Sequence, residues 1–159
     1  MTRNVHGTGL LLGETGVLLR GPSGAGKSVL ALSLLDRWEG RGLAAFLVAD
    51  DRVDLVPTGA GLTMVAPDQL AGLIELRGRG IVQRPFRREV PLHLVIDLVP
   101  DLVRMLEEDQ MVAEIEGVTL PRAPVPSGGV VSVGHQLLLV IEAIAALGRN
   151  ATASAEKTA

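Results

Sequence analysis

The segment Gly21-Pro22-Ser23-Gly24-Ala25-Gly26-Lys27-Ser28 decides the fold of this chain. It satisfies the pattern G-x-x-x-x-G-K-[ST], and it lies between an apolar run at 17–19 and a helical repeat at 31–38. A strand, this loop and a helix, in that order, form the phosphate-binding loop (P-loop) of nucleotide-binding domains. The glycines let backbone N–H groups turn toward phosphate oxygens, Lys27 can reach the β- and γ-phosphates, and Ser28 can offer its hydroxyl to Mg²⁺. We therefore expect ATP and Mg²⁺ to bind along this segment.

The residues on either side of the loop predict the other elements. Ala31, Leu34, Leu35 and Trp38 recur at helical spacing, so they predict a helix with one buried face. Apolar runs and turn residues predict hairpins at 9–19 and 52–65, strands at 43–49, 73–76, 81–82 and 92–98, and helices at 67–72, 101–110 and 137–145; the stretch 112–125 is ambiguous. The fold class that follows is α/β, a single P-loop-containing domain at 1–149 with a mixed central sheet and flanking helices. The small and polar stretch 150–159 predicts a disordered tail.

Composition narrows the class of protein. The 159 residues are 47% hydrophobic, which suits one domain with one core. Cysteine is absent, and no apolar run has the length of a membrane span or the form of a signal peptide, so the expected location is cytoplasmic. A net charge of −3 and 2% aromatic residues argue against nucleic acid as a partner.

Two strand ends compete for the catalytic carboxylate. Asp50 and Asp51 follow the apolar run 43–49, and ligand sites in parallel α/β sheets lie at the carboxyl ends of strands. Adjacent residues at a strand end point to opposite sides, so the two aspartates can have different roles. Asp97 also follows an apolar run, but its strand continues through Leu98 and Val99. We therefore rank Asp50 and Asp51 first.

Three motifs in this order resemble one known family. They are Val5-His6-Gly7, the phosphate loop with the later Leu47-Val48-Ala49-Asp50-Asp51, and Leu73-Ile74-Glu75-Leu76-Arg77-Gly78-Arg79-Gly80-Ile81, which is similar to the signature E-[ILV]-R-G-x-G-I. Together they resemble the C-terminal catalytic domain of HPr kinase/phosphorylase, in the short form that lacks the N-terminal domain. The resemblance is close over 4–86 and loose over 121–146.

The resemblance implies an ATP-dependent serine kinase that acts on HPr, a small phosphocarrier protein of the sugar phosphotransferase system. Family members also remove that phosphate by attack of inorganic phosphate. By resemblance, Asp50 is the general base, Asp51 supports the metal together with Ser28, and His6 lies near the phosphates and Asp50. Glu75 and Arg77 shape the phosphate-handling site. The family also forms hexamers, so the resemblance suggests a homo-oligomer.

Two positions depart from the family pattern. Val29 stands directly after Ser28, where the family usually has an acidic residue, and this puts metal binding in question. Ser127-Gly128-Gly129 lacks the arginine that the family usually carries there, which puts partner contact or the reverse reaction in question. Two alternatives stay open: a non-catalytic nucleotide-sensing regulator, which Val29 favours, and a P-loop kinase of a small molecule.

Overall fold

A mixed six-stranded sheet forms the centre of the protein. The computed structural model describes residues 2–59 and 61–158, with side chains described to residue 148. The sheet has the order β11-β12-β10-β3-β2-β4, and its strands are β2 (Thr8–Leu12), β3 (Thr15–Arg20), β4 (Ala45–Ala49), β10 (Leu94–Val99), β11 (Val112–Ile115) and β12 (Val118–Pro126). Strand β10 runs parallel to both β3 and β12, while β2 runs antiparallel to both β3 and β4. The carboxyl ends of β3, β4, β10 and β12 therefore share one edge, and the predicted mixed sheet is confirmed.

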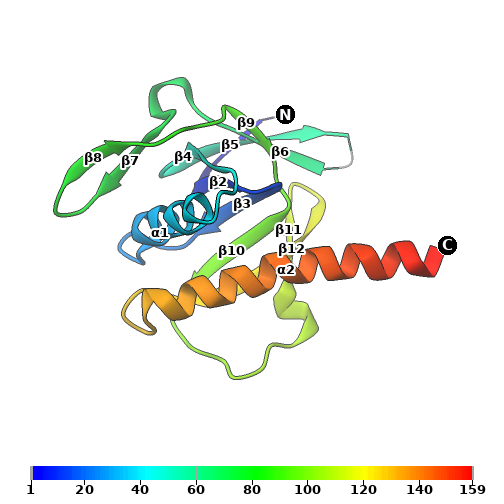
Figure 1. The fold of residues 1–159 in the computed structure, drawn as a ribbon. Helices are drawn as coiled ribbons and strands as arrows, with labels where there is room; N and C mark the ends of the chain where they lie inside the picture. Colours follow the sequence, from blue (N-terminus) through cyan, green and yellow to red (C-terminus); the bar gives the residue numbers. More distant parts are fainter. Residues whose placement is uncertain (1, 60, 159) are drawn as a thin grey trace.

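Both helices cover the same face of this sheet. Helix α1 (Lys27–Gly40) and helix α2 (Val133–Thr158) share one hydrophobic cluster with Val17 and Leu19 of β3. The predicted apolar face of α1 is confirmed, since Ala31, Leu34, Leu35 and Trp38 are all buried. In Figure 1, α2 runs along the lower part of the molecule and the central strands lie above it.

A second sheet covers the other face. It has the order β1-β5-β6-β9 and consists of β1 (Arg3–His6), β5 (Arg52–Thr58), β6 (Gly61–Val65) and β9 (Glu89–Pro91), paired antiparallel throughout. Leu18 and Val95 of the central sheet pack in one cluster with Val53, Leu55 and Met64 of this sheet. The domain is thus built from three layers, with β5, β6 and β9 at the top of Figure 1.

A small hairpin stands apart from both sheets. It consists of β7 (Leu73–Leu76) and β8 (Gly80–Gln83), and the short 3₁₀ helix η1 (Asp68–Leu70) precedes it. Figure 1 shows the hairpin extending to the left, above α1. Strands at 73–76 and 81–82 and a short helix within 67–72 were expected, and the structure confirms them.

The sequence-based expectation is wrong in the stretch after β10. We expected a helix at 101–110, but the structure has only the 3₁₀ helix η2 (Glu108–Met111), after an irregular loop. The apolar residues of this loop are exposed: Leu102 by 54%, Val103 by 48% and Met105 by 80%. A helix in proteins is stabilised mainly by burial of its apolar face, and these side chains remain exposed. The ambiguous stretch 112–125 forms β11 and most of β12.

The C-terminal stretch differs from the expectation in its backbone. Helix α2 continues through 150–158, where the sequence predicts a disordered tail, and Ala159 lies outside the described residues. The domain boundary at 149 stays a prediction. Among the described residues, no helix combines the length and the apolar character that a membrane crossing requires.

Candidate active site

The phosphate loop connects β3 to α1 at the shared carboxyl edge of the sheet. Gly24 and Gly26 have φ angles of 84° and 93°, in the left-handed region that glycine adopts without steric cost. The ammonium Nζ of Lys27 donates to the carbonyl oxygens of Gly21 at 2.7 Å and of Pro22 at 3.1 Å. Lys27 is only 8% exposed, and its burial lowers the pKa of the ammonium group, while the charges of Asp51 and Asp50 act in the opposite direction. The loop carbonyls therefore occupy the lysine ammonium group. A bound phosphate chain would take their place.

Asp50 connects three elements to this loop. Its carboxylate accepts hydrogen bonds from Thr8 Oγ1 at 2.8 Å, from Ser28 Oγ at 3.2 Å and from the backbone N–H of Glu75 at 3.4 Å. These donors come from β2, α1 and β7, so the carboxylate lies where the central sheet, the helix N-terminus and the hairpin meet. Asp50 is half-buried and its carboxylate is in contact with the hydroxyl predicted to bind Mg²⁺.

Asp51 takes a different direction because the backbone turns sharply at this position. Its φ angle is 71°, an uncommon value that aspartate tolerates better than most residues. The N–H of Arg52 donates to the carbonyl of Asp50 at 2.8 Å, and the N–H of Gly7 donates to the carbonyl of Asp51 at 2.9 Å. These bonds fix the turn. The geometry agrees with the expectation that the two aspartates have different partners.

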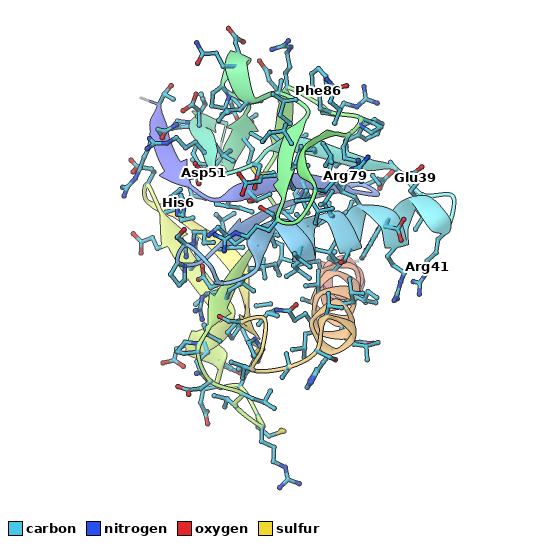
Figure 2. The ribbon with its side chains drawn as sticks, turned by 90° about the vertical axis from the view of Figure 1, so that its left-hand side faces the viewer. His6, Glu39, Arg41, Asp51, Arg79 and Phe86 are labelled. Atoms are coloured by element: carbon cyan, nitrogen blue, oxygen red, sulfur yellow. The ribbon has the colours of Figure 1, made fainter. Side chains whose placement is uncertain are left out.

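The partner of the Asp51 side chain is His6. The imidazole Nε2 lies 2.9 Å from Asp51 Oδ1, and the side chains are 50% and 67% exposed respectively. Figure 2 shows the two side by side. The structure therefore brings His6 to the site through Asp51.

A cleft of about 530 Å³ is lined by the phosphate loop and by both aspartates, and we call it the aspartate cleft; His6 is not among its lining residues. The phosphate loop, Asp50 and Asp51 form one wall, and Glu75, Arg77 and Ile81 of the β7–β8 hairpin lie on the other. Predicted residues from distant parts of the chain thus line one cavity of the size that small ligands occupy.

The competing carboxylate, Asp97, has another environment. It does not line the aspartate cleft. Arg20 donates to both of its oxygens at 2.8 and 2.9 Å, and Arg122 donates to Oδ2 at 2.6 Å. Burial alone would raise the pKa of Asp97, but the two guanidinium groups outweigh it and hold the pKa below its usual value. The charge of Asp97 is therefore already paired within the fold.

Sequence reasoning missed two contributors to the site. Thr8 is fully buried and its hydroxyl bonds to Asp50, but a single threonine in an apolar strand carries no distinctive signal. The second contributor is the loop at 127–132. Its segment Ser127-Gly128-Gly129 was considered from the sequence only for its missing arginine, yet the N–H of Gly128 donates to the carbonyl of Ala25 at 3.1 Å. The glycine pair Gly128-Gly129 was the available signal, because it permits this close approach of two backbones.

Known proteins are similar to this chain in sequence and in fold. A family model described as the HPr serine kinase C-terminal domain matches residues 1–158. The HPr kinase/phosphorylase of Bordetella pertussis is 32% identical over 154 residues, which cover 89% of this chain and 47% of that protein. The corresponding protein of Burkholderia cenocepacia is 34% identical over 151 residues, covering 87% of this chain and 44% of that protein.

A solved structure extends the comparison. The Hpr(Ser) kinase/phosphatase from Coxiella burnetii matches with a TM-score of 0.74 and 27% identity, over 98% of this chain and 96% of that one. The chain spans about half the length of the curated relatives it matches. On the family match over 1–158, the chain belongs to the family of the HPr serine kinase C-terminal domain.

Proposed function

We propose that this domain transfers the γ-phosphoryl group of ATP to a serine hydroxyl of an HPr-like phosphocarrier protein. The observation that carries the proposal is the Asp50 carboxylate, held at 3.2 Å from Ser28 Oγ in a cleft whose wall is the phosphate loop. Phosphoryl transfer needs a phosphate cradle and a carboxylate beside it, and both are present here. The relatives named HPr kinase/phosphorylase support the choice of substrate.

The phosphate loop would bind the triphosphate. Its backbone N–H groups and the N-terminus of α1 supply donors, and Lys27 supplies the positive charge. The lysine ammonium now bonds to the carbonyls of Gly21 and Pro22, and it would exchange these oxygens for phosphate oxygens on binding. Because the ammonium is nearly buried, its interaction with phosphate is little weakened by water.

The donor set fits Mg²⁺. Ser28 and Asp51 are the residues proposed to hold it, and the Asp50 carboxylate lies next to Ser28. Hydroxyl and carboxylate oxygens are the hard ligands that Mg²⁺ prefers, and it commonly binds one or two carboxylates together with nucleotide phosphates. The metal would neutralise charge on the phosphates during transfer.

Asp50 is the proposed general base. It would accept the proton of the serine hydroxyl as the serine oxygen bonds to the γ-phosphorus, while the bond from that phosphorus to the bridging oxygen breaks and ADP leaves. Thr8 and the Glu75 N–H hold the carboxylate in place. His6 and Asp51 would support this arrangement from the adjacent turn.

The reverse reaction would use the same groups. Inorganic phosphate would attack the phosphoserine phosphorus, and Asp50 would return its proton to the departing serine oxygen, so that pyrophosphate forms. Arg77 is the proposed donor to the attacking phosphate, because a guanidinium forks onto two phosphate oxygens and Arg77 lines the aspartate cleft with Glu75. We place the protein in the cytoplasm, where ATP is available, as an oligomer that the family resemblance suggests is a hexamer.

Radiolabel transfer tests the proposal. The protein is incubated with Mg²⁺, a purified HPr-like phosphocarrier and ATP labelled at either the γ- or the α-phosphate. The γ-label should appear on a carrier serine and the α-label should not. Lys27→Ala should remain folded by circular dichroism and should lose ATP binding or transfer, because Lys27 is the only side-chain cation of the loop. Normal ATP binding by the wild type without any transfer would contradict the kinase and favour the nucleotide-sensing regulator.

A further inference from the structure

The phosphate loop borders a second cleft on its other side. This cleft has a volume of about 630 Å³ and shares Gly24, Gly26 and Val29 with the aspartate cleft. Its far wall includes Val130 and Val133, so we call it the valine cleft. Every described residue that lines it is uncharged, whereas Asp50, Asp51 and Glu75 line the aspartate cleft. The loop therefore separates a charged cavity from an uncharged one.

The far wall of the valine cleft is fixed in position. The N–H of Gly128 donates to the Ala25 carbonyl at 3.1 Å, and the N–H of Ser127 donates to the Val99 carbonyl at 2.8 Å. Gln136, which is 3% exposed, donates from Nε2 to the Pro126 carbonyl at 2.8 Å. The first two bonds attach the 127–132 loop to the phosphate loop and to β10, and the third attaches the start of α2 to the end of β12. The cleft is thus pre-formed, which reduces the entropy lost when a ligand binds.

Three valine side chains are exposed to solvent in the valine cleft. Val29, Val130 and Val133 are exposed by 48%, 47% and 41%, and all three line it. Ligand sites typically combine such apolar walls with a few polar groups, here the backbone of the two loops and Ser132. A phosphate group would find no cationic side chain among the described lining residues, whereas a purine and ribose would find apolar contact and backbone hydrogen-bonding groups.

We propose that the valine cleft binds the nucleoside part of the nucleotide, its base and ribose. The inference rests on the proposed function, which places the γ-phosphate beside Asp50. The phosphate chain must then run back along the loop away from Asp50, and the valine cleft is the cavity that opens there. The nucleoside would pack on Val29 and Val130, and the aspartate cleft would stay open for the acceptor serine.

A matched pair of variants tests the contact. Val130→Ser removes an apolar side chain from the valine cleft, and Val103→Ser removes one of almost equal exposure, 48% against 47%, that lines neither cleft. Val130→Ser should weaken ATP binding by about three- to tenfold, as expected for loss of part of one valine contact. Val103→Ser should not weaken it. Both variants should bind inorganic tripolyphosphate as the wild type does, because the phosphate loop is unchanged. Equal ATP affinity in the two variants would overturn the proposal.

Photolabelling locates the base directly. Wild-type protein is irradiated with 8-azido-ATP, with and without excess ATP, and the labelled peptide is identified by mass spectrometry. The label should fall within 127–136 and should be prevented by ATP. A label within 70–81 would place the base in the aspartate cleft, and this would overturn the inference while leaving the proposed function intact. Failure of the wild type to bind either ATP or tripolyphosphate would instead overturn the proposed function itself, and the inference with it.

Discussion

Asp50 and Asp51 are neighbours in the chain, but the turn between them gives their side chains different partners. Asp50 accepts from Thr8 and Ser28 and is half-buried, whereas Asp51 pairs with His6 in a more exposed position. A carboxylate held by several donors suits a group that must keep one orientation during proton transfer. Asp51, in its more exposed pair with His6, remains accessible to a metal ion that would bind with the nucleotide.

Val29 lies directly after Ser28, a residue proposed to hold Mg²⁺, at a position where the family resemblance leads us to expect an acidic residue. It is 48% exposed and lines both clefts, so a longer acidic side chain there could reach Mg²⁺ or a water bound to it. It would also suit the positive end of α1. Val29→Glu should therefore lower, several-fold, the Mg²⁺ concentration that gives half-maximal transfer. The measurement is a Mg²⁺ titration at fixed ATP.

Val29→Gln is the matched control for this prediction. It has the length of glutamate without the charge, so its titration should follow that of the wild type. Three identical curves would show that position 29 does not act on the metal.

At the scale of single residues, the sequence singled out most of the polar residues that line the aspartate cleft. Lys27, Ser28, Asp50, Glu75 and Arg77 lie together because each belongs to a motif with a fixed relation to a strand or helix. Thr8 could not be predicted, because its role depends on the register of β2 against β3 and β4, which brings its hydroxyl to Asp50.

At the scale of elements, Asp97 joins three parallel strands. Asp97 lies in β10, Arg20 in the adjacent β3 and Arg122 in the adjacent β12. The carboxylate is 16% exposed and the guanidinium groups 34% and 22%. The Asp97 ion pairs therefore connect β3, β10 and β12 next to Gly21, where the phosphate loop begins.

Asp97→Asn should destabilise the fold while leaving the aspartate cleft intact. Loss of the charge leaves two partly buried guanidinium groups without their partner, and the free energy of unfolding at pH 7 should fall by about 1–3 kcal/mol. Because the folded pKa of Asp97 is lowered, its stabilisation is complete above the unfolded pKa of about 4 and is lost as the pH falls through the folded value. Urea denaturation of both proteins should therefore show a difference that shrinks at acidic pH.

The control for this prediction is Asp68→Asn. Asp68 also pairs with an arginine, Arg88, but its side chain is 96% exposed, so the change should have little effect at any pH. Equal stability of the Asp97→Asn variant and the wild type at pH 7 would contradict the structural role of the carboxylate.

Elements with a local signal were predicted well, and the others were not. The hairpins, α1 and β10 follow from turn residues and apolar repeats. Strand β1 has no such pattern, since Arg3-Asn4-Val5-His6 is mostly polar and acquires its structure by pairing with β5. The stretch 101–110 has helical composition, but its apolar side chains remain exposed, and a short helix without a buried apolar face is not stable.

At the scale of the whole molecule, the candidate site lies at one edge of the central sheet. The carboxyl ends of four strands lie there, and the phosphate loop divides that edge into the aspartate and valine clefts. The sequence predicted a mixed sheet with flanking helices, but not that both helices share one face. A strand buried on both sides is apolar throughout, so its sequence does not tell which face packs against helices and which against a second sheet. The second cleft likewise depends on a contact between loops about 100 residues apart in the sequence, at Ala25 and Gly128.

The central claim is that this molecule transfers a phosphoryl group with Asp50 as the base, and Asp50→Asn tests it most directly. The variant keeps the shape of the side chain but cannot accept the serine proton. We expect turnover onto the phosphocarrier to fall by about 100- to 10,000-fold, with ATP affinity nearly unchanged by isothermal titration. Asp97→Asn, measured well below its unfolding temperature, should keep its turnover. Undiminished transfer by Asp50→Asn, or loss of transfer by a folded Asp97→Asn that still binds ATP, would contradict the claim.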